Sequence, residues 1–421
     1  MDPAVTVLFL GLLIFLGNIL SRFFTLTKIP DVLFLIAIGI IVGPFLGYVS
    51  PAEFGVVGPL FTMVTLAIIL FEGGLHITIE TLKKAITGTT AIIVVSFVVI
   101  TIICIVTMTS WAGFSLIEAC MLGAILGGTS SAVVIPLTRY LNIGTDTKAI
   151  LALESAISDV LCIVVLLALV NVVKLQKINA GHIIGEFIAS FLIAIIIGVV
   201  AGIWWSSVYH KLTSIKSIFI TMAFVFIVFG FVSLLGFSGA IAALALGLTL
   251  GNLNYFKAEK ILPSLVDKVT QVELTPVETE FFSQLVSLLK TFFFIYIGIS
   301  IHFTNMNIIY MGALLTIFIY LARIAIVWFT IPRSIPPSDA AVVAVMEPKG
   351  LAAAVLASLP LGAGVAAGQT IQDVTYIVIF FSILACSILI FLLEKTPFTR
   401  AYRKLFWMFG KETAVSSEHQ K

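Results

Sequence analysis

The sequence predicts an all-α polytopic membrane protein with about thirteen transmembrane helices, and three observations support this fold class. The composition is the first: of 421 residues, 60% are hydrophobic and 10% are charged, whereas soluble domains carry roughly 25% charged residues. The second is the recurrence of apolar segments long enough to cross a bilayer. The third is a strong asymmetry of Lys and Arg between alternate loops.

The apolar segments have the length of about 20 residues that a spanning helix needs. They are expected at 4–22, 30–48, 56–75, 88–108, 116–138, 149–173, 182–206, 217–234, 237–252, 282–303, 306–331, 338–360 and 372–394. The longest loop, 253–281, holds charges of both signs and is expected on the cytoplasmic side.

The basic residues orient these spans. If the N-terminus lies outside, 18 of the 23 Lys and Arg residues fall in the inside loops and tail, and only Lys174 and Lys177 fall outside. Such an excess is what the positive-inside rule describes, and a missed span would destroy it. We therefore expect a multi-pass protein of the plasma membrane with a cytoplasmic tail over 396–421.

Two pairs of glycine-containing segments match at equal spacing. Ile36–Pro44 of the second span matches Leu244–Asn252 of the ninth, and Phe71–Ile77 of the third span matches Ile295–Ile301 of the tenth. The offset of seven spans is odd, so the two halves cross the membrane in opposite directions. This pattern predicts an inverted-topology repeat, which is a common plan of secondary transporters.

The predicted repeats occupy 1–180 and 211–395, and a single span over 181–210 links them. Inverted-repeat transporters place their sites where helices are interrupted near the bilayer midplane. Two equivalent spans have such interruptions, at Gly-Gly-Thr-Ser-Ser near 127–131 and at Met-Glu-Pro-Lys-Gly near 346–350. Gly and Pro weaken a helix, and Ser and Thr can satisfy the freed backbone groups.

The sixth span carries four polar residues on one helix face, because Glu154 and Ser158 lie four apart, as do Ser155 and Asp159. Asp159 lies about ten residues from the inner end, or roughly 15 Å deep. Thr129, Ser130 and Lys349 reach a similar depth. Hydroxyl and carboxylate oxygens suit a hard alkali cation, and a proton can compete for the carboxylate. The candidate ion- and proton-binding residues are Asp159, Ser155, Ser158, Thr129 and Ser130.

Several other charges also lie within spans, where each costs at least ~2.5–3.5 kcal/mol at the bilayer centre. The cations are Lys290, Arg323 and Lys349, and the acids are Glu72, Glu154, Asp159 and Glu347. If each cation pairs with one acid, one carboxylate remains, and we expect this to be Asp159. Similar depth predicts a Glu72–Arg323 ion pair, whereas Lys290 is either a snorkelling lysine or a partner of Glu347.

The remaining function classes receive little support. A net charge of +2 and the absence of a basic run interleaved with aromatic residues argue against a nucleic-acid partner. The sequence has no catalytic triad, phosphate loop or metal cluster, so we expect neither an enzyme nor a bound cofactor. An ion-coupled organic-solute symporter on a similar fold is the main alternative, and a channel and a non-transporting receptor are weaker ones.

Four motifs resemble those of the monovalent cation:proton antiporter superfamily, in particular its NhaP-like sodium (or potassium)/proton exchangers. They are Phe71-Glu-Gly-Gly-Leu75, Glu154-Ser-Ala-Ile-Ser-Asp159, Leu321-Ala-Arg323 and Glu347-Pro-Lys-Gly350. The resemblance covers the whole transmembrane region. It implies a mobile core domain built on two crossing broken helices, a dimerisation domain, a homodimer and elevator-like alternating access.

The resemblance also assigns roles to residues. It makes Asp159 the carrier of cation and proton, with Thr129 and Ser155 as further ligands of the alkali cation, and it pairs Lys349 with Glu154. Three departures from the family pattern matter: Ser130-Ser131 replaces Asp-Pro, Ser158 replaces Asn, and Lys349 replaces Arg. A non-acidic residue at 158 implies electroneutral exchange, whereas the missing carboxylate at 130 leaves Na+ against K+ open.

Overall fold

The computed structural model describes most of the predicted spans. The described residues are 11, 12, 15, 30–50, 57–76, 78–79, 89–175, 180–212, 219–253, 276–301, 305–395 and 404–410. Within them every regular element is a helix. Most of the predicted first span, 4–22, and most of the 253–281 loop lie outside the described residues.

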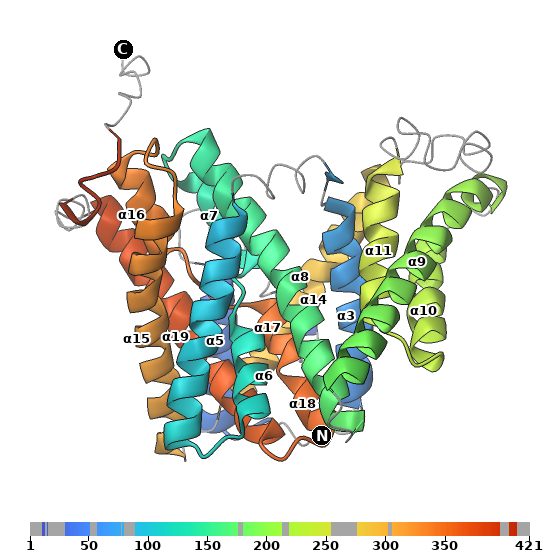
Figure 1. Ribbon diagram of the computed structural model, residues 1–421, viewed down its shortest axis with the longest axis horizontal. Helices are drawn as coiled ribbons and strands as arrows, with labels where there is room; N and C mark the ends of the chain where they lie inside the picture. Colours follow the sequence, from blue (N-terminus) through green and yellow to red (C-terminus); the bar gives the residue numbers. More distant parts are fainter. Residues whose placement is uncertain are drawn as a thin grey trace, which may run out of the picture. The chain divides into compact units, whose positions relative to one another are not determined.

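The helices follow the predicted spans closely (Figure 1). They are α2 (Asp31–Ile40), η1 (Ile41–Phe45), α3 (Val57–His76), α5 (Thr90–Trp111), α6 (Leu116–Leu126), α7 (Ser131–Tyr140), α8 (Thr145–Leu175), α9 (Ala180–Leu212), α10 (Phe219–Leu234), α11 (Gly239–Gly251), α14 (Pro276–Ser300), α15 (Met306–Thr330), α16 (Pro337–Val345), α17 (Leu351–Leu356), α18 (Ser358–Gly362) and α19 (Gly368–Lys395). Among the described residues, six helices are long and apolar enough to cross a membrane, and six more are shorter apolar helices.

The chain forms two compact units. The first contains 51–84 and 167–293, and the second contains 6–50, 85–166 and 294–421. Each unit draws helices from both predicted repeats, because it combines segments from both halves of the chain. The two compact units therefore do not coincide with the two predicted repeats, and the boundaries of the repeats stay a prediction.

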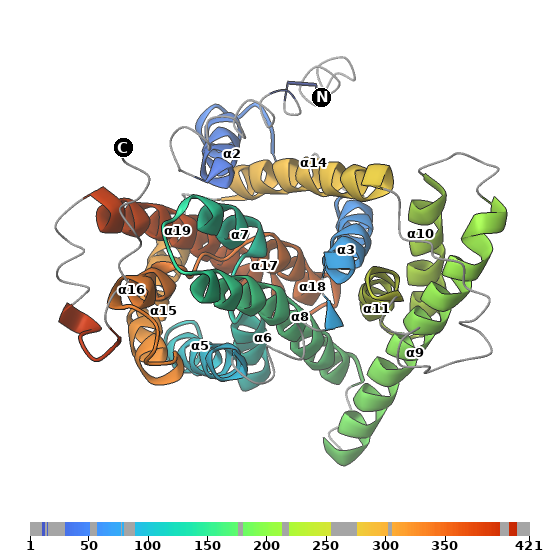
Figure 2. The same cartoon turned by 90° about the horizontal axis from the view of Figure 1, so that it is seen from above.

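In the first unit, α11 lies between α3 and α9 (Figure 2). Its sequence, GAIAALALGLTLG, consists largely of small residues, which let helix backbones approach closely in a membrane protein. A Cβ atom on Gly247 of α11 would overlap the carbonyl oxygen of Phe71, and one on Gly74 of α3 would overlap that of Leu244. The two helices therefore touch backbone to backbone.

The second unit contains the equivalent contact between α2 and α14. A Cβ atom on Gly39 would overlap the carbonyl oxygen of Ile295, and one on Gly298 would overlap that of Ile36. The predicted repeat matches Gly39 with Gly247 and Gly298 with Gly74. The two glycine contacts therefore agree residue for residue with the predicted equivalence of the two halves.

This packing gives a prediction for two adjacent glycines of α3. Gly74→Ala should destabilise the protein by about 1–3 kcal/mol, because the new methyl group overlaps the α11 backbone. Gly73→Ala is the matched control: its methyl group meets nothing within 4 Å, and alanine favours the helix by roughly 1 kcal/mol. Melting of the two purified variants in detergent checks this, and equal melting temperatures would contradict the close contact.

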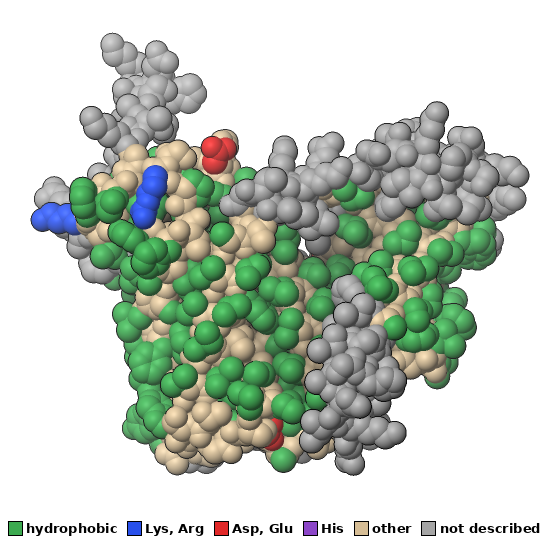
Figure 3. Space-filling view, viewed as in Figure 1, with side chains coloured by type: hydrophobic (Ala, Val, Ile, Leu, Met, Phe, Trp, Pro, Cys, Tyr) green, Lys and Arg blue, Asp and Glu red, His purple; other side chains and the backbone are tan. Residues whose placement is uncertain are grey.

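The outer surface of the second unit is apolar. Over α5 and α15, hydrophobic side chains cover the face seen in Figure 3, and the charged side chains in view lie toward the helix ends. The exposed hydrophobic residues on these two helices include Val98, Ile102, Ile317 and Leu321. Such a surface is suited to lipid rather than to water.

The described part of the C-terminal tail packs against the turn after α15. Phe406 and Phe409 are buried, and the Arg333 guanidinium lies 4.5 Å from the ring centroids of both Phe409 and Trp328. Trp407 is 74% exposed on the same short segment. Trp residues are enriched at the interface between membrane and water, so an exposed Trp407 suits a segment at the membrane surface.

Candidate ion-binding site at two broken helices

Two spans of the second unit are interrupted where the sequence predicts. Between α6 and α7 the chain leaves the helix over 127–130, and between α16 and α17 it does so over 346–350 (Figure 1). The two unwound segments meet: Ser130 N donates a hydrogen bond to Pro348 O over 2.7 Å. A Cβ atom on Gly350 would overlap the Ser130 side chain. The absence of a side chain at Gly350 therefore permits the crossing.

Each unwound segment is also bonded to a serine on the following span. Thr129 N donates to Ser158 Oγ of α8 over 3.1 Å, and Lys349 N donates to Ser382 Oγ of α19 over 2.9 Å. The predicted repeat matches these spans in pairs, so the two bonds are equivalent. They satisfy backbone groups that a broken helix would otherwise leave unpaired in the membrane.

Asp159 lies beside this crossing. Ser131 Oγ, at the first residue of α7, donates a hydrogen bond to Asp159 Oδ2 over 3.0 Å. Asp159 is partly exposed, whereas the neighbouring Ser155 and Ser158 are buried. Ser155 Oγ donates to Ala152 O within its own helix. The structure therefore brings the start of α7 to the Asp159 carboxylate and Thr129 to Ser158 on the same helix.

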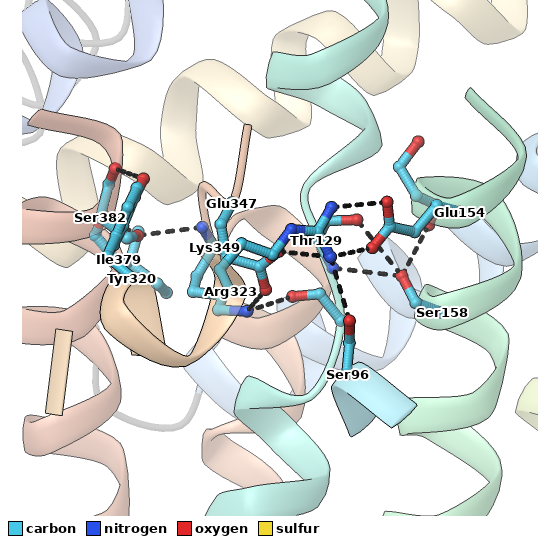
Figure 4. A network of polar contacts seen from close by, with 12 residues as sticks. Ser96, Thr129, Glu154, Ser158, Tyr320, Arg323, Glu347, Lys349, Ile379 and Ser382 are labelled. Carbon is cyan, nitrogen blue, oxygen red and sulfur yellow. Dashed lines mark hydrogen bonds and ion pairs between the residues drawn. The ribbon is translucent and has the colours of Figure 1, made fainter. Parts of the chain in front are cut away.

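The buried charges form a network around Arg323 of α15 (Figure 4). The guanidinium donates to Glu154 through both terminal nitrogens, with distances of 2.5 Å and 2.7 Å, and it lies 3.2 Å from Glu347 Oε2. Arg323 also donates to Ser96 Oγ of α5 and to Val343 O of α16. A forked arginine–carboxylate pair fixes geometry as well as charge.

Lys349 completes the network. Its Nζ atom lies 2.6 Å from Glu347 Oε1 and donates to Gly128 O over 3.0 Å. Gly128 O lies just beyond the C-terminal end of α6, where a positive charge is favoured by the helix dipole. Lys349 thus links both unwound segments.

Two predicted pairings are wrong. The expected partner of Lys349, Glu154, is bound by Arg323 instead, because the guanidinium reaches it from α15 with two hydrogen bonds. The expected partner of Arg323, Glu72, lies in the first unit, where it is bonded to His76 and Ser283. Glu72 and Arg323 were predicted to lie at similar depth in the membrane. They belong to different compact units, however, and each is bonded within its own unit.

Sequence reasoning missed three residues that contact the site. Ser131 donates to Asp159, Ser96 accepts from Arg323, and Ser382 accepts from Lys349 N. Ser131 could have been predicted from the sequence, because it belongs to the Gly-Gly-Thr-Ser-Ser motif at 127–131. Ser382 could have been found by extending the repeat from the sixth span to the thirteenth.

The network of Arg323, Lys349, Glu154 and Glu347 balances two positive against two negative charges. Among the described residues, Asp159 has no cation within ion-pair distance. The unwound segments bring backbone oxygens and hydroxyl groups to the same region. This arrangement is suited to exchange a proton and a small cation on one carboxylate.

Comparisons with known proteins identify the family and the fold. The model of the family "Sodium/hydrogen exchanger, transmembrane" matches residues 11–395. A structure of the sodium proton antiporter MjNhaP1 from Methanocaldococcus jannaschii at pH 8 is 20% identical, with a TM-score of 0.71, over 92% of this chain and all of that chain. An electron-microscopy structure of MjNhaP1 gives a TM-score of 0.66 at 20% identity, over 93% of this chain and 97% of that chain.

The solved structures establish a shared fold across nearly the whole chain. The family match covers far more than half of the 421 residues. It spans both broken helices and every residue of the charge network. The chain therefore belongs to the family of transmembrane sodium/hydrogen exchangers.

Proposed function

We propose that this protein exchanges a monovalent cation, Na+ or K+, for a proton across the plasma membrane, and that both ions compete for Asp159. The observation that carries the proposal is the contrast between Asp159 and the two carboxylates of the charge network, Glu154 and Glu347. Glu154 and Glu347 are held by Arg323 and Lys349. Asp159 accepts only a serine hydroxyl among the described residues, so it remains available to a transported ion.

The residues around Asp159 supply the further ligands. Thr129, Ser130 and Ser131 lie at the start of α7 or just before it, and Ser155 and Ser158 lie on the helix of Asp159 itself. Ser130 Oγ is buried and has no hydrogen-bond partner among the described residues. An oxygen in that state is a ready ligand for a hard cation, which takes oxygen ligands.

Transport proceeds by alternating access in the proposed mechanism. The charge network and both broken helices lie in one compact unit, which suits an elevator-like motion of that unit as a body. Ser158 is not acidic, so one cation exchanges for one proton and the cycle is electroneutral. We further propose a homodimer with the N-terminus outside and the C-terminus in the cytoplasm.

Competition at one carboxylate gives a pH prediction. The apparent KM for the cation should rise as the pH falls, by up to about tenfold per pH unit, because one bound proton displaces one cation. Initial exchange rates at several cation concentrations between pH 6 and 9 measure this. A KM that does not change with pH, combined with a changing maximal rate, would contradict a shared site.

The decisive experiment uses the full chain in proteoliposomes that contain a pH-sensitive dye. Na+, K+, Li+ or choline is added outside, and internal pH is followed with and without a potassium–valinomycin clamp. Alkalinisation with an alkali cation but not with choline, unchanged by the clamp, supports electroneutral antiport and identifies the ion. No response to any cation would reject the proposal and favour the solute symporter.

A further inference from the structure

Two acidic residues outside the charge network occupy equivalent places in the fold. Glu118 is the third residue of α6, and Asp339 is the third residue of α16. These two helices are the first halves of the broken spans, which the predicted repeat matches with each other. In the membrane the two N-termini point toward opposite faces, because the repeats are inverted.

Asp339 holds the start of the helix that carries Asp159. Its Oδ2 atom accepts hydrogen bonds from Gly144 N and from Thr147 Oγ1, both over 2.8 Å. Gly144 immediately precedes α8, and Thr147 is the third residue of that helix. Asp339 is 4% exposed and Thr147 is 1% exposed. One buried carboxylate thus lies at the N-termini of two helices, where the helix dipoles favour negative charge.

Glu118 makes the corresponding contact with α19. Its Oε1 atom accepts a hydrogen bond from Ala367 N over 3.0 Å, and Ala367 immediately precedes α19. The other oxygen, Oε2, closes a capping box with Ser115 on α6. In both cases an acid at the third position of a half-helix binds the residue before the next span of the opposite repeat. Two unrelated acidic residues are not expected to share the same helix position and the same kind of backbone donor.

We propose that Asp339 and Glu118 are positioning residues for ion exchange, which fix the depth of α8 and α19 against the two unwound segments. Thr147 lies twelve residues before Asp159, or about 18 Å along α8. Because a helix is stiff over this length, fixing its start fixes the depth of Ser158 and Asp159. Glu118 does the same for Ser382 on α19. The effect on transport rests on the proposed function, whereas the effect on helix position does not.

Two buried cysteines report the positions of the two helices separately. Cys162 of α8 lies against the first unwound segment, because a Cβ atom on Gly128 would be 2.9 Å from its sulfur. Cys386 of α19 lies against the second, with its sulfur 3.8 Å from Met346 Sδ. Both are buried. Local loosening of either helix should expose its cysteine to a membrane-permeant maleimide.

The test measures maleimide labelling of each cysteine by peptide mass spectrometry in the full-length protein. Thr147→Val removes one hydrogen bond to Asp339 without changing the shape of the side chain, and it should speed the labelling of Cys162 by roughly fivefold. Labelling of Cys386 should not change. Glu118→Met has a side chain of similar length without an accepting oxygen, and it should speed Cys386 labelling by a similar factor and leave Cys162 unchanged.

Matched controls separate positioning from general loosening. Thr147→Ser retains the hydroxyl group that donates to Asp339. Ser338→Ala removes only the hydrogen bond from Ser338 to Asp339 Oδ1. Ser115→Ala removes the serine hydroxyl of the capping box on α6 and leaves the bond from Ala367 to Glu118 in place. All three should label like wild type. Buried Cys104 on α5 should be unaffected throughout, because neither contact involves that helix.

Transport provides the second readout. In proteoliposomes, Thr147→Val should raise the apparent cation KM severalfold with little loss of maximal rate per folded protein, and Thr147→Ser should not. Equal acceleration at Cys104, Cys162 and Cys386 would reveal only lost stability and would overturn the proposal, as would unchanged labelling. If wild type exchanges no cation, the labelling result still decides the positioning role, and only the proposed function fails.

Discussion

Asp159→Asn is expected to abolish cation-driven proton exchange while leaving the fold intact. The amide cannot carry the negative charge that a bound cation needs. It also cannot take up and release a proton at the pH values at which exchange is measured. Its oxygen can still accept the hydrogen bond from Ser131. Since Asp159 has no cation partner among the described residues, the substitution leaves no opposite charge uncompensated. The melting temperature in detergent should therefore be equal to that of wild type or higher.

The measurement is the internal pH of proteoliposomes after addition of Na+ or K+, with empty liposomes as the baseline. Ser131→Ala is the matched control, because it removes the hydrogen bond to Asp159 but retains the carboxylate. That variant should keep exchange with an altered cation KM. If Asp159→Asn exchanged at the wild-type rate, the carrier would be a different residue. A strong drop in melting temperature would instead assign Asp159 a structural role.

Arg323→Gln is expected to have the largest effect on stability. The guanidinium is the common partner of Glu154 and Glu347, and all three side chains are almost fully buried. Removing it leaves the network with one excess negative charge. Breaking a buried ion pair in this way costs about 3–5 kcal/mol, because the remaining charge is desolvated without compensation. A large fall in melting temperature, or failure to purify a monodisperse protein, is the expected outcome.

A second substitution tests the electrostatic reason. Combining Arg323→Gln with Glu154→Gln restores a balanced network of Lys349 and Glu347. The double variant should therefore melt at a higher temperature than Arg323→Gln alone. If the two losses simply added, the damage would come from lost packing or from the hydrogen bond to Ser96, and the charge explanation would be incorrect.

The sequence predicted the helices and the breaks well, because their signals are local. Span length follows from the thickness of the bilayer, and the interruptions follow from Gly and Pro within apolar runs. Glu154 and Asp159 were assigned to one helix because helical spacing is fixed. The glycine matches predicted the equivalence of the two halves, and the same glycines make the backbone contacts in both units, although those contacts were not predicted from the sequence.

The ion pairs could not be predicted from the same information. Position along a span gives only the depth of a side chain, and two residues at one depth can lie on unconnected helices. Depth favoured Glu72 as the partner of Arg323, whereas the packing of α5, α8 and α15 brings Glu154 to it instead. The contacts of Asp339 with Gly144 and Thr147 were hidden for another reason. They depend on where the N-termini of α8 and α16 meet, and Gly144 and Asp339 lie 195 residues apart in the chain.

The paired serine contacts have a consequence for the number of ions carried. Ser158 and Ser382 hold the two unwound segments in the same way, but Asp159 follows the first serine and Ile383 follows the second. The two matched crossings therefore differ at the position after the serine, which is acidic in one and aliphatic in the other. Under the proposed function, this difference predicts that each transport cycle carries one cation, bound at the acidic position.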